Sequence, residues 1–284
     1  MRIAAAVILY YPDNEIVQRI QSYLNEVTTL YILDNSENNT GHKALLKTLD
    51  TDKVVYLHDG ENKGISIRLN QAAILAAEQQ AEWLLTMDQD SYFPANIVAQ
   101  YFNCLENSLS KENTAMFGVQ FLNAPLHADC AFVEAKHLIT SGSIVNLNIF
   151  QIIGGFDEAL FIDKVDHEYC LRARALNYKV IEFSNIFLHH HLGNVTYGRS
   201  LKNFQLTPRV LHSPIRMYYI MRNYLYLKDK YKGQFTDSFE EMRKEIWNRT
   251  KNNFLYGKNK WAVIKYLLKG YQDYSAGKMG KIIN

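Results

Sequence analysis

Two carboxylates separated by one residue follow an apolar run near the middle of the chain. The run Trp83–Met87 is typical of a buried strand, and Asp88 and Asp90 come directly after it. Ligands of open α/β sheets bind at the carboxyl ends of the strands. Carboxylates there suit a hard cation such as Mg2+ or Mn2+, which also contacts substrate phosphates. The alternative is a solvated loop, because Asp-x-Asp arises by chance about once in a chain of this length.

Two further sites are predicted at the same edge. Asp34 ends the apolar segment 30–33 and can accept hydrogen bonds from a ribose or a base, although an Asx turn explains it equally well. Gly64 precedes a helical pattern, so backbone amides and the positive end of the helix dipole face an anion there. The sequence contains no GxGxxG after its first strand and no GxxxxGK[ST], which disfavours a dinucleotide site and a P-loop.

Acidic residues are also concentrated between positions 157 and 168. A helix that begins near Val165 places Asp166 and Glu168 in its first turn, where the helix dipole favours carboxylates. Such a carboxylate can take a proton from a substrate hydroxyl, which is worth about 10²–10⁴-fold in rate. A solvated acidic helix start is the alternative interpretation.

Three histidines, 189–191, end a predicted strand at 179–188. Strand geometry places His190 on the face opposite to its two neighbours. Its imidazole can complete the ligand set of a metal or contact a phosphate. Adjacent histidines without cysteine partners do not form a structural zinc site.

The elements that must position these residues alternate between strand and helix, which predicts a parallel sheet with right-handed crossovers. The strands are predicted at 3–10, 30–33, 54–57, 83–87, 115–122, 132–139 and 179–188. The helices are predicted at 14–24, 43–49, from Ile65, from Pro94, from Pro214, at 237–255 and at 261–271.

Composition places the protein among globular proteins. Its 284 residues are 48% apolar and 21% charged, enough for one sizeable core with an appendage. The three cysteines are widely spaced and suggest no disulfide framework, so we expect a reducing cytosol. No run of 18 apolar residues occurs, so no segment is expected to span a bilayer.

The charge is unevenly distributed along the chain. Residues 199–284 carry a net charge of +12, whereas residues 1–198 carry −10. A basic, aromatic-rich tail predicts contact with an anionic surface, and packing on the acidic body is the alternative. In the last predicted helix one side carries Trp261, Ile264, Leu268 and Tyr271, and another carries lysines. The Tyr- and Arg-rich helix from Pro214 has a similar composition, so we expect the tail to lie in a membrane interface unless its aromatic face packs internally.

Taken in order, these segments resemble the inverting family-two nucleotide-sugar glycosyltransferases with the GT-A fold, and most closely their bacterial rhamnosyltransferase branch. The resemblance covers about residues 3–230. It rests on Val7-Ile8-Leu9-Tyr10-Tyr11-Pro12, Leu33-Asp34-Asn35-Ser36, Asn62-Lys63-Gly64 with Asn70, Met87-Asp88-Gln89-Asp90-Ser91, Ser141-Gly142-Ser143, Gly154-Gly155-Phe156-Asp157-Glu158, Phe161-Ile162-Asp163-Lys164-Val165-Asp166-His167-Glu168, His190-His191-Leu192-Gly193 and His212-Ser213-Pro214-Ile215-Arg216 with Tyr218-Tyr219 and Arg222-Asn223.

The resemblance implies a role for each matching residue. It implies an α/β catalytic domain at 1–198, with a nucleotide-sugar half at about 1–92 and an acceptor half at about 93–198, followed by a helical region at 199–284. The implied donor-binding residues are Tyr10, Asp34, Asn62, Gly64 and Asp88. The implied ligands of a divalent metal are Asp88, Asp90 and His190, the implied base is Asp166, and the implied acceptor region contains Ser141, Gly142, Asp163 and Glu168. Tyr11 departs from the Asn that is frequent in the family, and Val165 departs from a frequent Glu.

The implied activity is metal-dependent transfer of a sugar, rhamnose in the matching branch, from a dTDP- or UDP-linked donor to a glycan or lipid-linked acceptor for cell-surface polysaccharide. The expected location is the cytoplasm, with peripheral contact at the inner face of the membrane, and no nucleic-acid partner is expected because no such module is present. Two alternatives remain. A nucleotidyltransferase would carry a Gly-rich basic loop after the first strand, which Tyr10-Tyr11-Pro12-Asp13 does not provide. A non-catalytic domain that binds sugar or membrane would not need the acidic residues.

Overall fold

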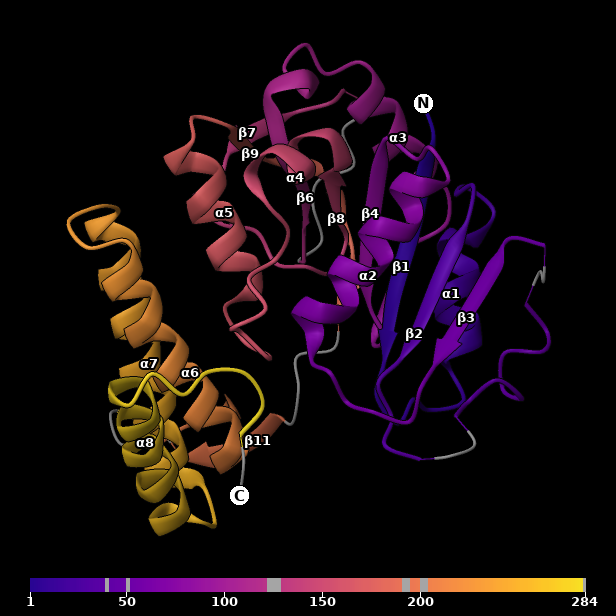
Figure 1. The fold of residues 1–284 in the computed structure, drawn as a ribbon. Helices are drawn as coiled ribbons and strands as arrows, with labels where there is room; N and C mark the ends of the chain where they lie inside the picture. The colour runs from indigo at the N-terminus through magenta and orange to yellow at the C-terminus, as the bar shows by residue number, and fades with distance from the viewer. Residues whose placement is uncertain (39–40, 50–51, 122–128, 191–194, 200–203, 283–284) are drawn as a thin grey trace. The chain divides into compact units, whose positions relative to one another are not determined.

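A computed structural model describes residues 1–38, 41–49, 52–121, 129–190, 195–199 and 204–282. The chain forms two compact units (Figure 1). The sheet unit comprises residues 1–158 and 165–190, and the helical unit comprises residues 159–164 and 191–284. None of the described helices combines the length and the apolar character that crossing a bilayer requires.

The sheet unit is built around a mostly parallel eight-stranded sheet. Its strand order is β3-β2-β1-β4-β8-β6-β9-β7. The strands are β1 (Ile3–Leu9), β2 (Leu30–Asp34), β3 (Val54–His58), β4 (Trp83–Asp88), β6 (Thr114–Gln120), β7 (Phe132–Glu134), β8 (Ser143–Asn146) and β9 (Lys179–Phe187). The first four strands run parallel to one another, and β6 runs parallel to β9, whereas β8 and β7 run antiparallel to their neighbours.

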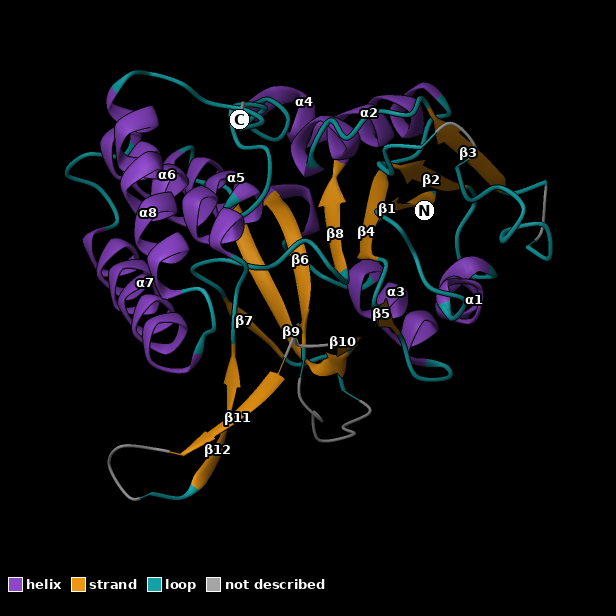
Figure 2. Cartoon of the chain, turned by 90° about the horizontal axis from the view of Figure 1, so that it is seen from below, coloured by secondary structure: helices purple, strands orange, loops and turns teal. Residues whose placement is uncertain are grey.

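Five helices cover the two faces of this sheet. Helices α2 (Ile65–Glu78), α4 (Leu147–Ile153) and α5 (Val165–Ala175) lie on one face, and α1 (Ile16–Leu24) and α3 (Ile97–Glu106) lie on the other (Figure 2). All seven residues of β1 and all five of β2 are buried, as expected for parallel strands covered on both faces. The apolar runs therefore predict the central strands well.

The strand order contains a switch point at the site edge. From β1 the chain proceeds outward through β2 to β3, and it then returns to place β4 on the other side of β1. Open α/β sheets bind ligands at the carboxyl ends of the strands beside such a switch point. Asp88 is the last residue of β4, so the first predicted carboxylate lies at this switch point.

Several local predictions are corrected by the structure. Residues 43–49 form turns instead of a helix, and the strand predicted at 132–139 ends at Glu134. Pro94 precedes α3 by three residues instead of opening it. The strand–helix pair formed by β8 and α4 was not predicted, because a short apolar run does not distinguish a strand from a buried helix.

The prediction that the cysteines form no disulfide is wrong. Cys104, at the end of α3, is bonded to Cys130, whereas Cys170 is a buried free thiol. The two partners are 26 residues apart in sequence, so their spacing gave no indication of pairing. Disulfides persist in oxidising environments, so this bond removes the cysteine-based argument for a reducing compartment.

The helical unit contains three long helices and a hairpin. They are α6 (Pro214–Lys230), α7 (Thr236–Tyr256) and α8 (Lys260–Ser275), and the hairpin pairs β11 (Val195–Arg199) with β12 (Leu206–Val210). Ser213 caps α6, with its hydroxyl accepting a hydrogen bond from the amide of Arg216, as the Ser-Pro pair predicts. Gly270 allows α8 to pack closely on α6, since a Cβ atom there would lie 2.8 Å from the Tyr218 carbonyl oxygen.

Three of the four tyrosines of α6 lie in the core of this unit, which corrects their predicted place in a membrane interface. Tyr218, Tyr219 and Tyr224 are all buried. Arg222 is fully buried, and its guanidinium lies 5.1 Å from the ring centroids of both Tyr218 and Tyr219. For α6, the alternative of internal packing is therefore the correct one.

Candidate functional site

Asp88, Asp90 and His190 come together in the sheet unit. Each offers one ligand atom, and these atoms lie within 4.8 Å of one another. All three side chains are partly buried, so they are held by the fold and still reachable from solvent. Burial raises the pKa of Asp90, but hydrogen bonding and positive charge from His190 outweigh it and hold the pKa below its usual value. Two carboxylates and an imidazole fit a divalent cation such as Mn2+ or Mg2+.

A short strand pair brings His190 to the two aspartates. Strand β10 (His189–His190) pairs antiparallel with β5 (Ser91–Tyr92), so that His190 lies opposite Ser91. His190 Nδ1 lies 2.8 Å from Ser91 Oγ and 3.4 Å from Asp90 Oδ1. His189 instead stacks on Tyr92, in agreement with its predicted place on the opposite face. The third histidine, His191, lies outside the described residues.

Tyr10 and Ser141 lie next to the two aspartates. The Tyr10 amide donates to Gln89 Oε1 at 2.7 Å, and Gln89 Nε2 donates back to the Tyr10 carbonyl, which ties the Asp-x-Asp loop to the end of β1. Ser141 Oγ accepts from the Asp88 amide at 3.2 Å, while the next amide, that of Gly142, donates to the carbonyl of Thr86 in β4. Sequence reasoning missed Gln89, for which the only signal was its place between two aspartates.

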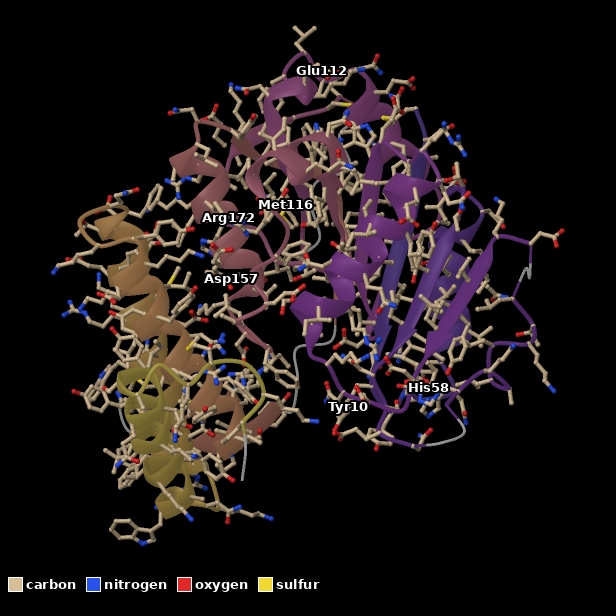
Figure 3. All side chains as sticks on the ribbon, viewed as in Figure 1. Tyr10, His58, Glu112, Met116, Asp157 and Arg172 are labelled. Carbon is tan, nitrogen blue, oxygen red and sulfur yellow. A yellow bond between two sulfur atoms is a disulfide. The ribbon has the colours of Figure 1, made fainter. Side chains whose placement is uncertain are left out.

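Figure 3 shows this edge of the sheet unit. Tyr10 and His58 lie together at the carboxyl ends of β1 and β3, and Glu112 lies at the opposite edge (Figure 3). The sequence predicted the functional site at this edge, where the carboxyl ends of the parallel strands lie.

Asp34 is fully buried in a network of its own. Tyr56 Oη and His42 Nδ1 lie 2.7 and 2.8 Å from its Oδ2, and the Ser36 amide donates to its Oδ1. Burial raises the pKa of Asp34, but hydrogen bonds from Ser36, Tyr56 and His42 outweigh it, so the pKa is lowered. The carboxylate is thus ionised and held in place, and its role toward a ribose or base stays a prediction. No pattern in the sequence predicted that His42 and Tyr56 bind this carboxylate.

A buried arginine supports the loop that contains Asn62 and Gly64. Gly64 has φ of +84°, which favours glycine, and its amide donates to Asn62 Oδ1. Arg68 is buried and donates to Asn35 Oδ1, to the Asp59 carboxylate and to the Glu61 carbonyl. The Gly64 amide already donates to Asn62, so an anion bound at the start of α2 would accept hydrogen bonds from other backbone amides.

Asp166 lies in the first turn of α5, as predicted. Its Oδ1 accepts from the amide of His167 at 2.7 Å and lies 2.8 Å from Nδ1 of the same residue. The His167 ring stacks on His137 at 4.4 Å, which fixes the ring and therefore the carboxylate. Its role as a base stays a prediction.

Glu168, in the same turn, is fully buried and bonded to Arg172. Both carboxylate oxygens accept from Arg172, which also donates to the carbonyls of Ile153 and Gly155. The arrangement anchors the Gly154-Gly155 turn to α5, and a role of Glu168 toward an acceptor stays a prediction.

Arg172→Met should lower the free energy of unfolding by about 3–5 kcal/mol, because it removes the guanidinium that donates to both oxygens of the buried Glu168 carboxylate. Denaturant unfolding measures this change. Lys179→Met is the matched control, since it breaks the exposed pair with Glu134 and should cost less than about 1 kcal/mol. An equal loss of unfolding free energy in the two variants would show that the buried Glu168–Arg172 pair stabilises the fold no more than the exposed pair does.

Asp163 belongs to the helical unit and forms an ion pair there. Arg216 Nε lies 3.1 Å from its Oδ1, and Asn223 Nδ2 donates to the backbone carbonyls of Ile162 and Asp163. Both Asp163 and Lys164 have positive φ, a strained conformation that these contacts hold. Burial raises the pKa of Asp163 despite Arg216. The strained segment immediately precedes α5, and a role of Asp163 toward an acceptor stays a prediction.

His212, just before α6, makes the stability of the protein depend on pH. Burial, together with the positive charges of Arg249 and Arg216, lowers its pKa to about 4, although Glu245 opposes the shift. Folded His212 therefore stays neutral where the unfolded chain binds a proton, so stability is present above pH 6.5 and is lost as the pH falls toward 4.

Between pH 7.5 and 4.5 this group should cost about 1–2 kcal/mol of stability, because His212 is only half-buried and solvent screens part of the shift. Urea unfolding at the two pH values measures the loss, and His212→Gln should reduce it by that amount. An unchanged loss in the variant would show that His212 is not the responsible group.

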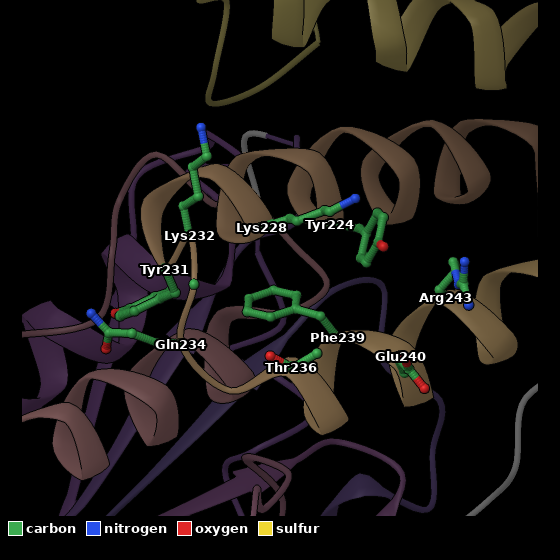
Figure 4. A pocket seen from close by; sticks show the side chains of 10 residues that line it. Tyr224, Lys228, Tyr231, Lys232, Gln234, Thr236, Phe239, Glu240 and Arg243 are labelled. Carbon is green, nitrogen blue, oxygen red and sulfur yellow. The ribbon is translucent and has the colours of Figure 1, made fainter.

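The helical unit also contains a cavity of about 290 Å³ at the junction of α6 and α7 (Figure 4). It is lined by Tyr224, Lys228, Tyr231, Lys232, Gly233, Gln234, Thr236, Phe239, Glu240 and Arg243. None of the residues predicted to carry chemistry lines it.

Comparisons with known proteins support the fold. No protein-family model matches the chain. The dTDP-rhamnosyl transferase RfbF of Shigella flexneri is 28% identical over 243 residues, covering 78% of each chain. The structure of GalNAc-T7 with UDP, GalNAc and Mn2+ matches 97% of this chain with a TM-score of 0.59 at 11% identity, and the chain spans 56% of that protein. The mannosyltransferase PcManGT of Pyrobaculum calidifontis, in complex with GDP-Man and Mn2+, matches 99% of this chain and 76% of its own, with a TM-score of 0.56 at 13% identity. The chain therefore has the GT-A fold of these glycosyltransferase structures, and its sequence is similar to that of a bacterial dTDP-rhamnosyl transferase.

Proposed function

We propose that this glycosyltransferase moves rhamnose from a dTDP- or UDP-linked donor to a glycan or lipid-linked acceptor, with inversion and with a divalent metal. The observation that carries the proposal is the grouping of Asp88, Asp90 and His190 at the sheet's switch point. The name of the Shigella relative supports rhamnose, and the two Mn2+-containing neighbours support a divalent cation.

The residues of the site have separate tasks in this proposal. Asp88, Asp90 and His190 would hold the cation, which when bound neutralises the charge of the departing diphosphate. Ser91 orients the His190 ring, and the Tyr10–Gln89 hydrogen bonds hold the loop between the two aspartates. Positioning and charge stabilisation supply most of the rate when little covalent chemistry is required.

Asp166 is the proposed base. Its carboxylate would take up the hydroxyl proton of the acceptor, and the hydrogen bond from His167 to Oδ1 holds this carboxylate in place. As this proton leaves, the acceptor oxygen bonds to the anomeric carbon while the bond from that carbon to the diphosphate oxygen breaks on the opposite face. Attack from the face opposite to the leaving group inverts the anomeric configuration.

A panel of nucleotide sugars tests the proposal. We expect release of nucleoside diphosphate from a dTDP- or UDP-linked sugar in the presence of Mn2+ or Mg2+, and proton NMR of the product reports the anomeric configuration. Formation of a nucleotide sugar from a nucleoside triphosphate and a sugar 1-phosphate, with release of pyrophosphate, would instead indicate a nucleotidyltransferase. Donor binding without release of either product, with every acceptor tried, would indicate a non-catalytic domain.

A further inference from the structure

One stretch of the helical unit is basic without any acidic residue. Residues Ile246–Gln272 contain six Lys and Arg residues and no Asp or Glu. They form the second half of α7 and most of α8. All six acidic residues of the 199–284 region lie outside this stretch. Positive charge is thus concentrated on one part of one hairpin of helices.

The same stretch exposes large apolar side chains. Trp247 and Trp261 are 68% and 82% exposed, and Leu268 is 58% exposed. The other exposed members are Phe254, Leu255 and Tyr271. Soluble surfaces seldom gather this many large apolar side chains unless they bind something.

Helical spacing places these side chains on one face of each helix. On α7, Trp247 and Phe254 are seven residues apart, and on α8, Trp261 and Leu268 are also seven residues apart. Val263 and Gly270 are the buried residues of α8, and Gly270 contacts the backbone of α6. The exposed residues of α8 therefore lie on a different side from the residues that pack on α6.

Lysines are interleaved with these residues. Lys251, Lys258, Lys260 and Lys265 are exposed, and Lys260 Nζ lies 5.7 Å from the centroid of the Phe254 ring. Lysine stems extend along apolar surface while their ammonium groups reach an aqueous or anionic layer. Tryptophan and tyrosine rings favour the boundary between acyl chains and headgroups.

We propose that one surface of α7 and α8, called the α7–α8 face, docks on a bilayer with anionic headgroups. This face consists of Trp247, Lys251, Phe254, Leu255, Lys260, Trp261, Lys265, Leu268 and Tyr271. The absence of acidic residues makes its charge complementary to such a surface, and its exposed rings supply the apolar contact. The proposal deepens the proposed function because docking brings the enzyme to a lipid-linked acceptor.

Vesicle sedimentation tests the charge requirement in the full-length protein. At low salt we expect binding to phosphatidylcholine vesicles that contain phosphatidylglycerol, with weaker binding at high salt and to phosphatidylcholine alone. The variant K260Q/K265Q should bind about 25-fold less tightly, given about fivefold per lysine. The variant K228Q/K232Q removes equal charge at the α6–α7 junction and should change binding less than about threefold. Equal loss in the two variants would overturn the assignment to this face.

Apolar substitutions test the second requirement. W261S/L268S should weaken binding at least about tenfold. Ile74→Ser is the control, because Ile74 is 55% exposed on α2 of the sheet unit, and it should leave binding unchanged. Unaltered binding of W261S/L268S would show that rings and aliphatic chains do not insert.

Fluorescence gives an independent readout. Trp247 and Trp261 are exposed, whereas Trp83, the third tryptophan, is only 5% exposed in the sheet unit. We expect vesicles with brominated acyl chains to quench the wild type, and W247F/W261F to lose this quenching while keeping the Trp83 emission. No quenching in the wild type would overturn the proposal. Vesicle binding needs neither donor nor acceptor, so a failure here leaves turnover of soluble donors intact, and a failure of turnover leaves vesicle binding intact.

Discussion

Asp90→Ala should lower the rate of sugar transfer at least about 10³-fold and remove its dependence on Mn2+ or Mg2+. Asp90 is one of three ligand atoms grouped within 4.8 Å, and its low pKa keeps the carboxylate charged. Loss of charge stabilisation at a leaving diphosphate removes several kcal/mol from the transition state. Initial rates of nucleoside diphosphate release across a titration of Mn2+ measure the effect.

Two controls show whether the loss of activity in Asp90→Ala is due to loss of the metal. Glu134→Ala removes an exposed carboxylate of the same unit and should change the rate less than about twofold. Wild-type enzyme in excess chelator should be as inactive as the variant. Full activity in chelator would contradict a metal requirement, and Asp90→Ala activity above a tenth of wild type would place the metal elsewhere.

Asp166→Asn should lower kcat by about 10²–10⁴-fold while the dissociation constant of the donor stays near that of wild type. The amide keeps the shape of the side chain and can still accept from the His167 amide at Oδ1, but it cannot take up the acceptor proton. Single-turnover transfer, together with donor binding by titration calorimetry, separates the chemical step from binding.

Glu112→Gln is the matched control for Asp166→Asn, because Glu112 lies at the opposite edge of the sheet unit (Figure 3). It should leave both quantities unchanged. If Asp166→Asn turns over within threefold of wild type, another group takes the proton. A loss of donor affinity in Asp166→Asn would instead assign the carboxylate to donor binding.

Local patterns in the sequence were sufficient for every strand of the eight-stranded sheet except β8, for the site edge and for several helix ends. The buried runs of β1, β2 and β4 are mostly apolar, and β2 and β4 both end in an aspartate, so the sequence alone places Asp34, Asp88 and Asp90 at strand ends. The Ser213 cap and the acidic first turn of α5 could also be predicted from the sequence, because capping and dipole effects act within one helical turn.

Only the tertiary structure decides which distant residues meet. His190 reaches Ser91 across 99 positions through a two-residue strand pair, and Cys104 bonds to Cys130, neither of which a local pattern encodes. The tyrosines of α6 and the tryptophans of α7 and α8 look alike in sequence, yet packing buries the first group and exposes the second. The reason is physical: composition sets the gain from burying a side chain, but the arrangement of neighbouring elements determines which side chains are buried.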